Sequence, residues 1–177
     1  MSRACRLLLL FVIMSLATLP VPVQAQSGGP DTVSETYGDW TVRCSPDTSR
    51  AELPPALACE TSQELWQSES GQRLIAITLR RSDDGTRGTL TILAPFGLLL
   101  AAGLQIAVQD EVLVEMGFRT CLPAGCIAIA ELEDATVEAM AQASQITINM
   151  TAAATGEPVM VPLLTQGFAA AWARLAR

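Results

Sequence analysis

Short segments rich in aliphatic and β-branched residues, separated by turn residues, recur along most of the chain. Residues 37–44 alternate apolar and polar side chains, and residues 73–80 form a continuous β-rich run. Turn sequences lie between such runs, and Ser82-Asp83-Asp84-Gly85 is a clear one. Many short strands with turns about every 10–15 residues predict an antiparallel β-sandwich. The other predicted strands cover residues 58–63, 88–93, 112–119, 126–130, 146–150 and 159–161.

A long stretch without charge, Leu90 to Val108, lies in the middle of the chain. Its 19 residues approach the length of a membrane-spanning helix, which needs about 20. Pro95, Gly97 and Gly103 interrupt it, so we expect strand, turn and strand, buried on one or both faces. Within it, we expect residues 96–100 to belong to a core strand rather than to an exposed apolar patch.

Two helices are predicted in the C-terminal third. The first covers residues 131–143, with Leu132, Val137 and Met140 on one face. Its acidic residues Glu131, Glu133, Asp134 and Glu138 are expected to face solvent, and the first three would lie in its first turn. The second helix covers residues 168–176 and is rich in alanine.

The N-terminus has the three parts of a secretory signal peptide. Arg3 and Arg6 precede an uncharged apolar run of 13 residues, and Val23-Gln24-Ala25 is a small-residue cleavage site. The run is shorter than a membrane span, so we predict cleavage of residues 1–25 rather than a retained anchor. Cys5 precedes the apolar run, which argues against lipidation, and it would leave with the signal. Residues 26–35 are then expected to be a flexible leader, followed by one domain at 36–177.

Composition excludes several classes of function. Without the signal, nine arginines face 18 acidic residues, a net charge of about −9, which argues against nucleic acid and anionic lipid headgroups as partners. The chain has no histidine and no lysine, so it has no catalytic triad, no Schiff base and no P-loop lysine. We expect no cofactor and no metal, and we expect that the protein is not an enzyme. Hydrolysis of envelope glycans by two carboxylates stays open as an alternative.

Four cysteines remain after the signal: Cys44, Cys59, Cys121 and Cys126. An even number in an exported chain favours two disulfides, for which the sequence allows three pairings. We predict Cys44–Cys59 and Cys121–Cys126, because each pair is close in sequence and the second encloses the turn residues Pro123 and Gly125. A redox or zinc site is the less favoured alternative, since Cys-x4-Cys is not a thioredoxin motif.

Several short motifs occur in a fixed order around these cysteines. The first, Tyr37-Gly38-Asp39-Trp40-Thr41-Val42-Arg43-Cys44, resembles the opening of the invasion-associated locus B family of bacterial exported proteins. The remaining matches span nearly the whole chain after the signal. They are Cys59-Glu60 with Gln63, Pro95-Phe96-Gly97, Ala102-Gly103-Leu104, Phe118-Arg119-Thr120-Cys121, Gly125-Cys126, and Leu164 with Gly167-Phe168.

This resemblance implies an immunoglobulin-like β-sandwich in the periplasm or outer envelope of a Gram-negative bacterium. The family takes its name from a role in host-cell invasion, although members also occur where no host is invaded. It brings no catalytic residues to transfer. We therefore expect an exported, non-enzymatic protein, periplasmic, bound to the outer envelope or secreted, that binds a protein or envelope surface component. Peripheral association with the outer membrane fits this expectation, without a membrane span after cleavage.

A few residues are candidates for contact with a partner. Tyr37, Asp39 and Trp40 form an aromatic and acidic cluster suited to a sugar or peptide, although Trp40 is more readily explained as core and Asp39 as a turn residue. Trp66 lies near a polar loop and would be a binding anchor if exposed. Asp83 and Asp84 are better explained as a solvated turn than as a calcium site. A third functional alternative is a chaperone-like or structural periplasmic module with an apolar groove at residues 90–108.

Overall fold

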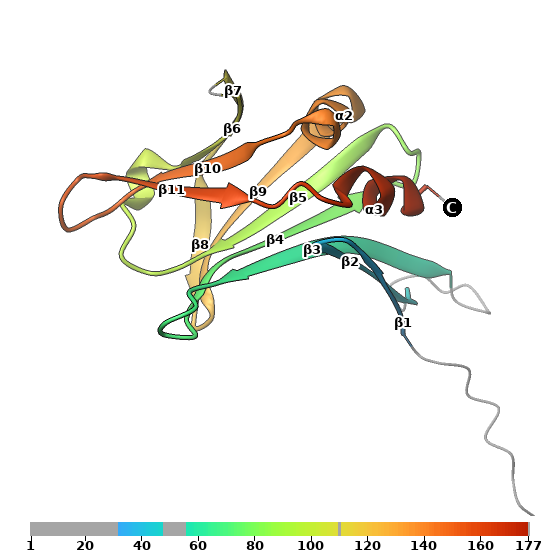
Figure 1. The fold of residues 1–177 in the computed structure, drawn as a ribbon, viewed down its shortest axis with the longest axis horizontal. Coiled ribbons are helices and arrows are strands. Elements are labelled where there is room, and N and C mark those ends of the chain that lie inside the picture. Colours follow the sequence, from blue (N-terminus) through green and yellow to red (C-terminus); the bar gives the residue numbers. More distant parts are fainter. Residues whose placement is uncertain (1–31, 48–55, 110, 177) are drawn as a thin grey trace, which may run out of the picture.

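The larger of two antiparallel sheets contains seven strands. The computed structural model describes residues 32–47, 56–109 and 111–176, and the predicted signal lies outside them. The strand order is β1-β2-β3-β4-β5-β9-β8 (Figure 1). The bounds are β1 Val33–Tyr37, β2 Trp40–Pro46, β3 Leu57–Trp66, β4 Arg73–Arg81, β5 Arg87–Ala94, β8 Phe118–Leu122 and β9 Gly125–Glu133.

The smaller sheet contains four strands in the order β11-β10-β6-β7. Both helices, α2 and α3, lie beside it, toward the end of the larger sheet that is opposite the β3–β4 turn (Figure 1). A short 3₁₀ helix, η1, precedes β6. The bounds are η1 Leu100–Ala102, β6 Leu104–Val108, β7 Glu111–Met116, α2 Asp134–Gln142, β10 Ile146–Thr151, β11 Pro158–Leu163 and α3 Phe168–Arg174.

The core lies between the two sheets and beneath the helices. On β4 the buried residues Ile75, Ile77 and Leu79 alternate with outward-facing ones, as the two-residue period of a strand requires. Ile146 and Ile148 on β10 face them from the smaller sheet within the same cluster. Trp172 and Phe168 of α3, and Val137 and Met140 of α2, complete it. The predicted mainly-β, two-sheet antiparallel fold with a short helix and a C-terminal helix is confirmed.

Both predicted disulfides are confirmed: Cys44 is joined to Cys59, and Cys121 to Cys126. Each bridge links directly opposed residues on neighbouring antiparallel strands, β2 with β3 and β8 with β9. Cross-strand partners hold their side chains close enough for a bridge. The bridges therefore reinforce one central strand pair and one edge pair of the larger sheet.

The structure corrects the predicted leader. Val33 to Glu35 were expected to be flexible but belong to β1, which pairs along its whole length with β2. Arg174 of α3 also donates to the Glu35 carboxylate, with an Nε to Oε2 distance of 2.9 Å. Strand β2 and Arg174 both lie outside residues 33–35, so the polar composition of residues 33–35 did not indicate these contacts. Residues 26–31 of the leader lie outside the described residues.

The start of the first predicted helix is also corrected. Residues 131–133 continue β9, where Thr89 and Arg87 of β5 pair with Glu131 and Glu133. Sheet pairing keeps these acidic residues extended, and Asp134 is the one acidic residue in the first turn of α2.

The segment 96–100 does not form the predicted core strand. Leu98 is buried and makes an isolated bridge to Ala152, but Phe96, Leu99 and Leu100 are exposed. Pro95 and Gly97 end β5 and turn the chain outward before η1. An exposed apolar patch at residues 96–100, the less favoured interpretation of the sequence, is therefore present. Within the described residues, no helix is both long and apolar enough to span a membrane.

Candidate interaction surface

Three of the four predicted contact residues lie at the β1–β2 turn. The hydroxyl of Tyr37 donates to Glu35 Oε2 at 2.6 Å. The side chain of Asp39 is exposed, and its backbone nitrogen donates to the Gln166 oxygen at 3.0 Å. Trp40 is fully buried and packs against Phe168, with ring centroids 4.4 Å apart and ring planes tilted by 34°. The cluster therefore does not present two aromatic rings to a ligand.

A buried polar network explains why Trp40 and Gln63 have these identities. The Trp40 indole nitrogen donates to the Leu164 carbonyl at 2.8 Å. Gln63 is 4% exposed; its amide nitrogen donates to the same oxygen at 2.9 Å, and its amide oxygen accepts from the Leu164 nitrogen at 3.1 Å. Buried polar groups need such partners. The network attaches the segment between β11 and α3 to the larger sheet, which is a structural role.

The fourth predicted residue, Trp66, is exposed at the end of β3. Its exposed fraction is 53%, against 0% for Trp40 and 4% for Trp172. The guanidinium carbon of Arg73 lies 6.0 Å from the centre of the Trp66 ring, within the range of a cation–π contact. Arg73 Nη2 also donates to the Ala124 carbonyl at 2.8 Å. Arg73 thus connects Trp66 to the disulfide-bridged β8–β9 turn.

Most of the large exposed hydrophobic side chains share the end of the larger sheet at which Trp66 lies. The strand registers bring the end of β3, the start of β4, the end of β5 and the β8–β9 turn to the same end of the larger sheet (Figure 1). Six of the ten large hydrophobic side chains that the structure describes as exposed lie on these elements or on the loop after β5. We call this group the apolar end: Trp66, Leu74, Phe96, Leu99, Leu100 and Leu122.

A shallow hollow of about 210 Å³ lies within the apolar end. Its lining comes from three elements and consists of Gln72, Arg73, Ala94, Pro95, Phe96 and Ala124. Arg73 and the exposed residue Phe96 both line this hollow, and Arg73 is the one charged residue in its lining.

Charge is segregated from the apolar end. The loop 95–103 and the turn 123–124 contain no charged residue, and the neighbouring loops 67–72 and 152–157 contain one each, Glu69 and Glu157. The opposite end of the larger sheet holds ion pairs such as Arg80–Glu60 and Arg81–Asp134, both at 2.6 Å. The chain is acidic as a whole, yet loop 95–103 and the turn 123–124 at this end are uncharged.

The turn of Asp83 and Asp84, at the charged end, has an internal explanation. Asp84 Oδ1 accepts from the Ser82 hydroxyl at 2.6 Å, from the Thr86 nitrogen at 3.0 Å and from the Thr86 hydroxyl at 2.8 Å. These bonds, that of Ser82 first, lower the pKa of Asp84 to about 2. In the described part of the chain, no group of three or more carboxylate or thiol side chains is placed to hold a metal ion.

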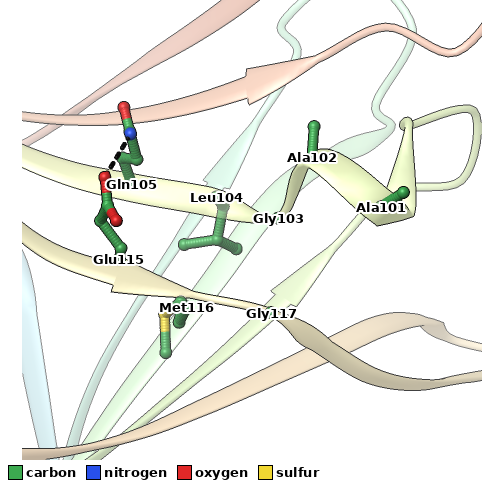
Figure 2. A pocket seen from close by; sticks show the side chains of 8 residues that line it. All are labelled: Ala101, Ala102, Gly103, Leu104, Gln105, Glu115, Met116 and Gly117. Atoms are coloured by element: carbon green, nitrogen blue, oxygen red, sulfur yellow. Dashed lines mark hydrogen bonds between the residues drawn. The ribbon is translucent and has the colours of Figure 1, made fainter.

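Hydrolysis of a glycan would require two carboxylates in one hollow, and three other hollows contain acidic side chains. Figure 2 shows a hollow of about 360 Å³ between η1, β6 and β7, in which Glu115 is the one acidic residue and accepts from Gln105 Nε2 at 2.8 Å. Two further hollows hold two acids each, Asp39 with Glu64 and Asp47 with Asp83. Arginine lines both of them as well, Arg43 in the first and Arg80 and Arg81 in the second.

Sequence reasoning selected Trp66 but missed Arg73, Leu74 and Leu122. The missing information is register, because Arg73 and Ala124 are 51 residues apart and meet only across the sheet. One local signal was available, since Phe96, Leu99, Leu100 and Leu122 all stand close to Pro or Gly in charge-free turns, where core burial is hard to achieve.

Comparison with known proteins gives a consistent result. Residues 40–176 match the family described as "Invasion associated locus B (IalB) protein". The chain is 32% identical over 167 residues to a protein named Invasion protein B homolog from Brucella abortus, covering 94% of this chain and 92% of that protein. It is also 32% identical, over 165 residues, to a protein named Invasion protein B from Bartonella bacilliformis, covering 91% and 80%. A crystal structure of invasion associated protein B from Bartonella henselae superposes with a TM-score of 0.71 and 26% identity, covering 81% of this chain and 95% of that one.

Proposed function

This chain belongs to the invasion associated locus B family, and from that premise we propose that it is an exported, non-enzymatic protein that attaches to a surface of the bacterial envelope through its apolar end. The names of its relatives motivate a further step, in which the attached protein takes part in contact with a host cell.

The observation that carries the proposal is the clustering of the apolar end. Scattered exposed hydrophobic residues are normal on protein surfaces, whereas a concentration of them in one region suggests a site of interaction. Here six exposed side chains, including Trp66 and Phe96, lie at one end of an otherwise acidic protein. Aromatic residues and arginine are also enriched at the centres of binding surfaces, which fits Trp66 beside Arg73.

Export is supported by the disulfides and by the signal-like N-terminus. Disulfides persist in oxidising compartments such as the periplasm and the cell exterior. The two bridges join all four cysteines that follow the predicted cleavage site. The N-terminal sequence supplies the route to such a compartment.

The chaperone-like alternative shares the same surface. Exposure of Phe96, Leu99 and Leu100 favours an apolar contact region, as that alternative requires. A groove that holds an unfolded segment would need walls around these side chains, whereas the hollow that Phe96 lines measures only about 210 Å³. Attachment to a surface therefore accounts better for the geometry.

Sedimentation with isolated envelopes tests the proposal. The protein, purified after export, is compared with a Phe96→Ser/Leu100→Ser variant, in which two exposed side chains of the apolar end become polar. The matched control is Leu57→Ser/Met160→Ser, which changes two side chains that are 60% and 66% exposed but lie elsewhere. We expect the first variant to lose most envelope binding and the control to keep it, with similar melting temperatures for all three proteins.

Two outcomes would refute the proposal. One is equal envelope binding by the Phe96→Ser/Leu100→Ser variant and the wild type. The other is equal loss of binding in both double variants, because that would show a dependence on general hydrophobicity rather than on this end of the domain.

A further inference from the structure

We propose that the surface bound by the apolar end is a lipid bilayer, with loop 95–103 entering the boundary between headgroups and acyl chains and Trp66 lying at headgroup level. This inference rests on the proposed function, because it names the surface to which the protein attaches. It is carried by the side chains of the loop, by its backbone hydrogen bonds and by the Trp66–Arg73 pair.

The loop has side chains suited to an apolar medium. Its sequence, Pro-Phe-Gly-Leu-Leu-Leu-Ala-Ala-Gly, contains no charge and no side chain that forms hydrogen bonds. Phe96 is 61% exposed, and Leu99 and Leu100 are 44% exposed each. No polar side chain of the loop would lose its water on insertion, so burying these residues in the interface is favoured by the hydrophobic effect alone.

Part of the loop backbone is paired within the protein. The nitrogen of Leu99 donates to the Thr151 oxygen at 2.8 Å. Those of Ala102 and Gly103 donate within η1 at 3.0 and 3.1 Å, and the Gly97 oxygen accepts from Ala153 at 2.8 Å. Unpaired backbone groups are costly in the hydrocarbon region, so these bonds reduce the cost of placing the loop at the boundary between headgroups and acyl chains. The neighbouring hairpin therefore supports the loop where solvent would otherwise do so.

Trp66 and Arg73 have the chemistry of a membrane interface. Tryptophan prefers the headgroup region, because its ring is apolar and its N–H is a donor. Arg73 has no acidic partner among the described residues; its contacts are the Trp66 ring and the Ala124 carbonyl. Its remaining donors are suited to a lipid phosphate, for which guanidinium is a strong ligand. Phe96 and Arg73 line the same hollow, so the two parts of the surface adjoin.

The distribution of charge favours one orientation. Loop 95–103 carries no charge, although Glu115 lines the same hollow as residues 101–103, and Glu69 and Glu157 lie on the neighbouring loops. An approach with the loop first therefore brings an uncharged segment to the phosphates. A small-molecule ligand is disfavoured, because the hollow of about 210 Å³ is smaller than typical ligand pockets of about 300–1,000 Å³.

Tryptophan fluorescence provides a direct test. Trp66 is the one exposed tryptophan of the three, so a change of environment at the apolar end changes the emission of this residue. On addition of vesicles of phosphatidylethanolamine with a minor fraction of phosphatidylglycerol, we expect a blue shift and quenching by lipids brominated in the upper acyl chain. Trp66→Phe should abolish the shift while the protein still sediments with the vesicles.

The same double variants identify the contact. We expect Phe96→Ser/Leu100→Ser to weaken partition into vesicles by at least about tenfold, and Leu57→Ser/Met160→Ser to change it little. Raising the salt concentration should weaken wild-type binding only slightly, since burial of apolar side chains supplies most of the attachment and the Arg73 contact with phosphate a small part. Absence of both sedimentation and blue shift for the wild type would overturn the inference, as would equal partition of the two double variants.

Failure of the bilayer assignment is distinguishable from failure of the proposed function. If lipid vesicles do not bind but isolated envelopes still bind through Phe96 and Leu100, the surface is a protein and only the bilayer assignment falls. If the wild type binds neither, both fall.

Discussion

The indole nitrogen of Trp40 donates a hydrogen bond to the carbonyl oxygen of Leu164 at 2.8 Å, although the two residues lie 124 positions apart. Gln63 contacts the same residue twice, through its amide nitrogen and its amide oxygen. The three residues come from β2, β3 and the segment after β11, so this network connects the larger sheet to the smaller one and to α3. Trp66, at the end of the same strand β3, takes no part in this network and is exposed.

We predict that Gln63→Leu lowers the free energy of unfolding by about 1–3 kcal/mol. The substitution removes the acceptor for the backbone nitrogen of Leu164 and leaves that group unpaired, which costs roughly this amount. Trp40→Phe should cost less from hydrogen bonding, because the Leu164 oxygen keeps its bond from Gln63. Urea denaturation measures both, and a Gln63→Leu variant as stable as the wild type would contradict the assignment.

We predict that Gly167→Ala destabilises the protein by about 2–5 kcal/mol. Gly167 has a φ of 88°, and a Cβ there would overlap the Tyr37 carbonyl and lie 2.9 Å from the Gly38 nitrogen. Gly156 is the matched control, with a φ of 73° and no atom near the added Cβ. Gly156→Ala should therefore cost only the backbone strain, about 1–2 kcal/mol. Equal melting temperatures for the two variants would show that the close approach of Gly167 to β1 is not tight.

We predict that the two disulfides contribute unequally. The chain-entropy relation gives about 3 kcal/mol for the bridge with a sequence separation of 15, Cys44–Cys59, and about 2 kcal/mol for the bridge with a separation of 5, Cys121–Cys126. Cys44→Ala/Cys59→Ala should thus lower stability more than Cys121→Ala/Cys126→Ala. Thermal unfolding of the two double variants gives the comparison, and the reverse order would show that loop length does not set their contributions.

We predict that Asp84 titrates far below an ordinary aspartate. Its pKa is lowered from 3.8 to about 2 by the hydroxyl of Ser82, followed by the nitrogen and hydroxyl of Thr86. Since the folded-state pKa is the lower one, the stabilisation is present above pH 3.8 and is lost as the pH falls toward 2. Carboxyl NMR should show this pKa directly. Asp84→Asn should flatten the decline in melting temperature over that interval, and an unchanged decline would show that Asp84 does not cause it.

Local pattern was sufficient to predict most strands and the disulfides. Apolar residues at every second position, Ile75, Ile77 and Leu79, predict a strand with one buried face, and the structure buries them. The cysteines lie close enough in sequence to suggest their partners. β1 was missed because its order comes from β2 and from the Arg174–Glu35 contact, neither of which is visible within residues 33–35.

The site was harder to predict than the fold, because the exposure of a side chain depends on which other segments of the chain cover it. Loop 95–103 has the composition of a core segment, and only its position beyond the end of β5 leaves Phe96 and Leu99 uncovered. Trp40 and Trp66 are a second example. Trp40 is buried and Trp66 is exposed, although the residues around them in the sequence do not indicate this difference.

Hydrogen–deuterium exchange of the wild-type protein, free and bound to isolated envelopes, tests whether the apolar end is the surface of attachment. We expect slower exchange on binding at the backbone amides of residues 96–103 and at the end of β3 near Trp66, with little change on β7 and β11. Protection confined to β7 or β11, or none at residues 96–103, would show that the protein attaches through another surface.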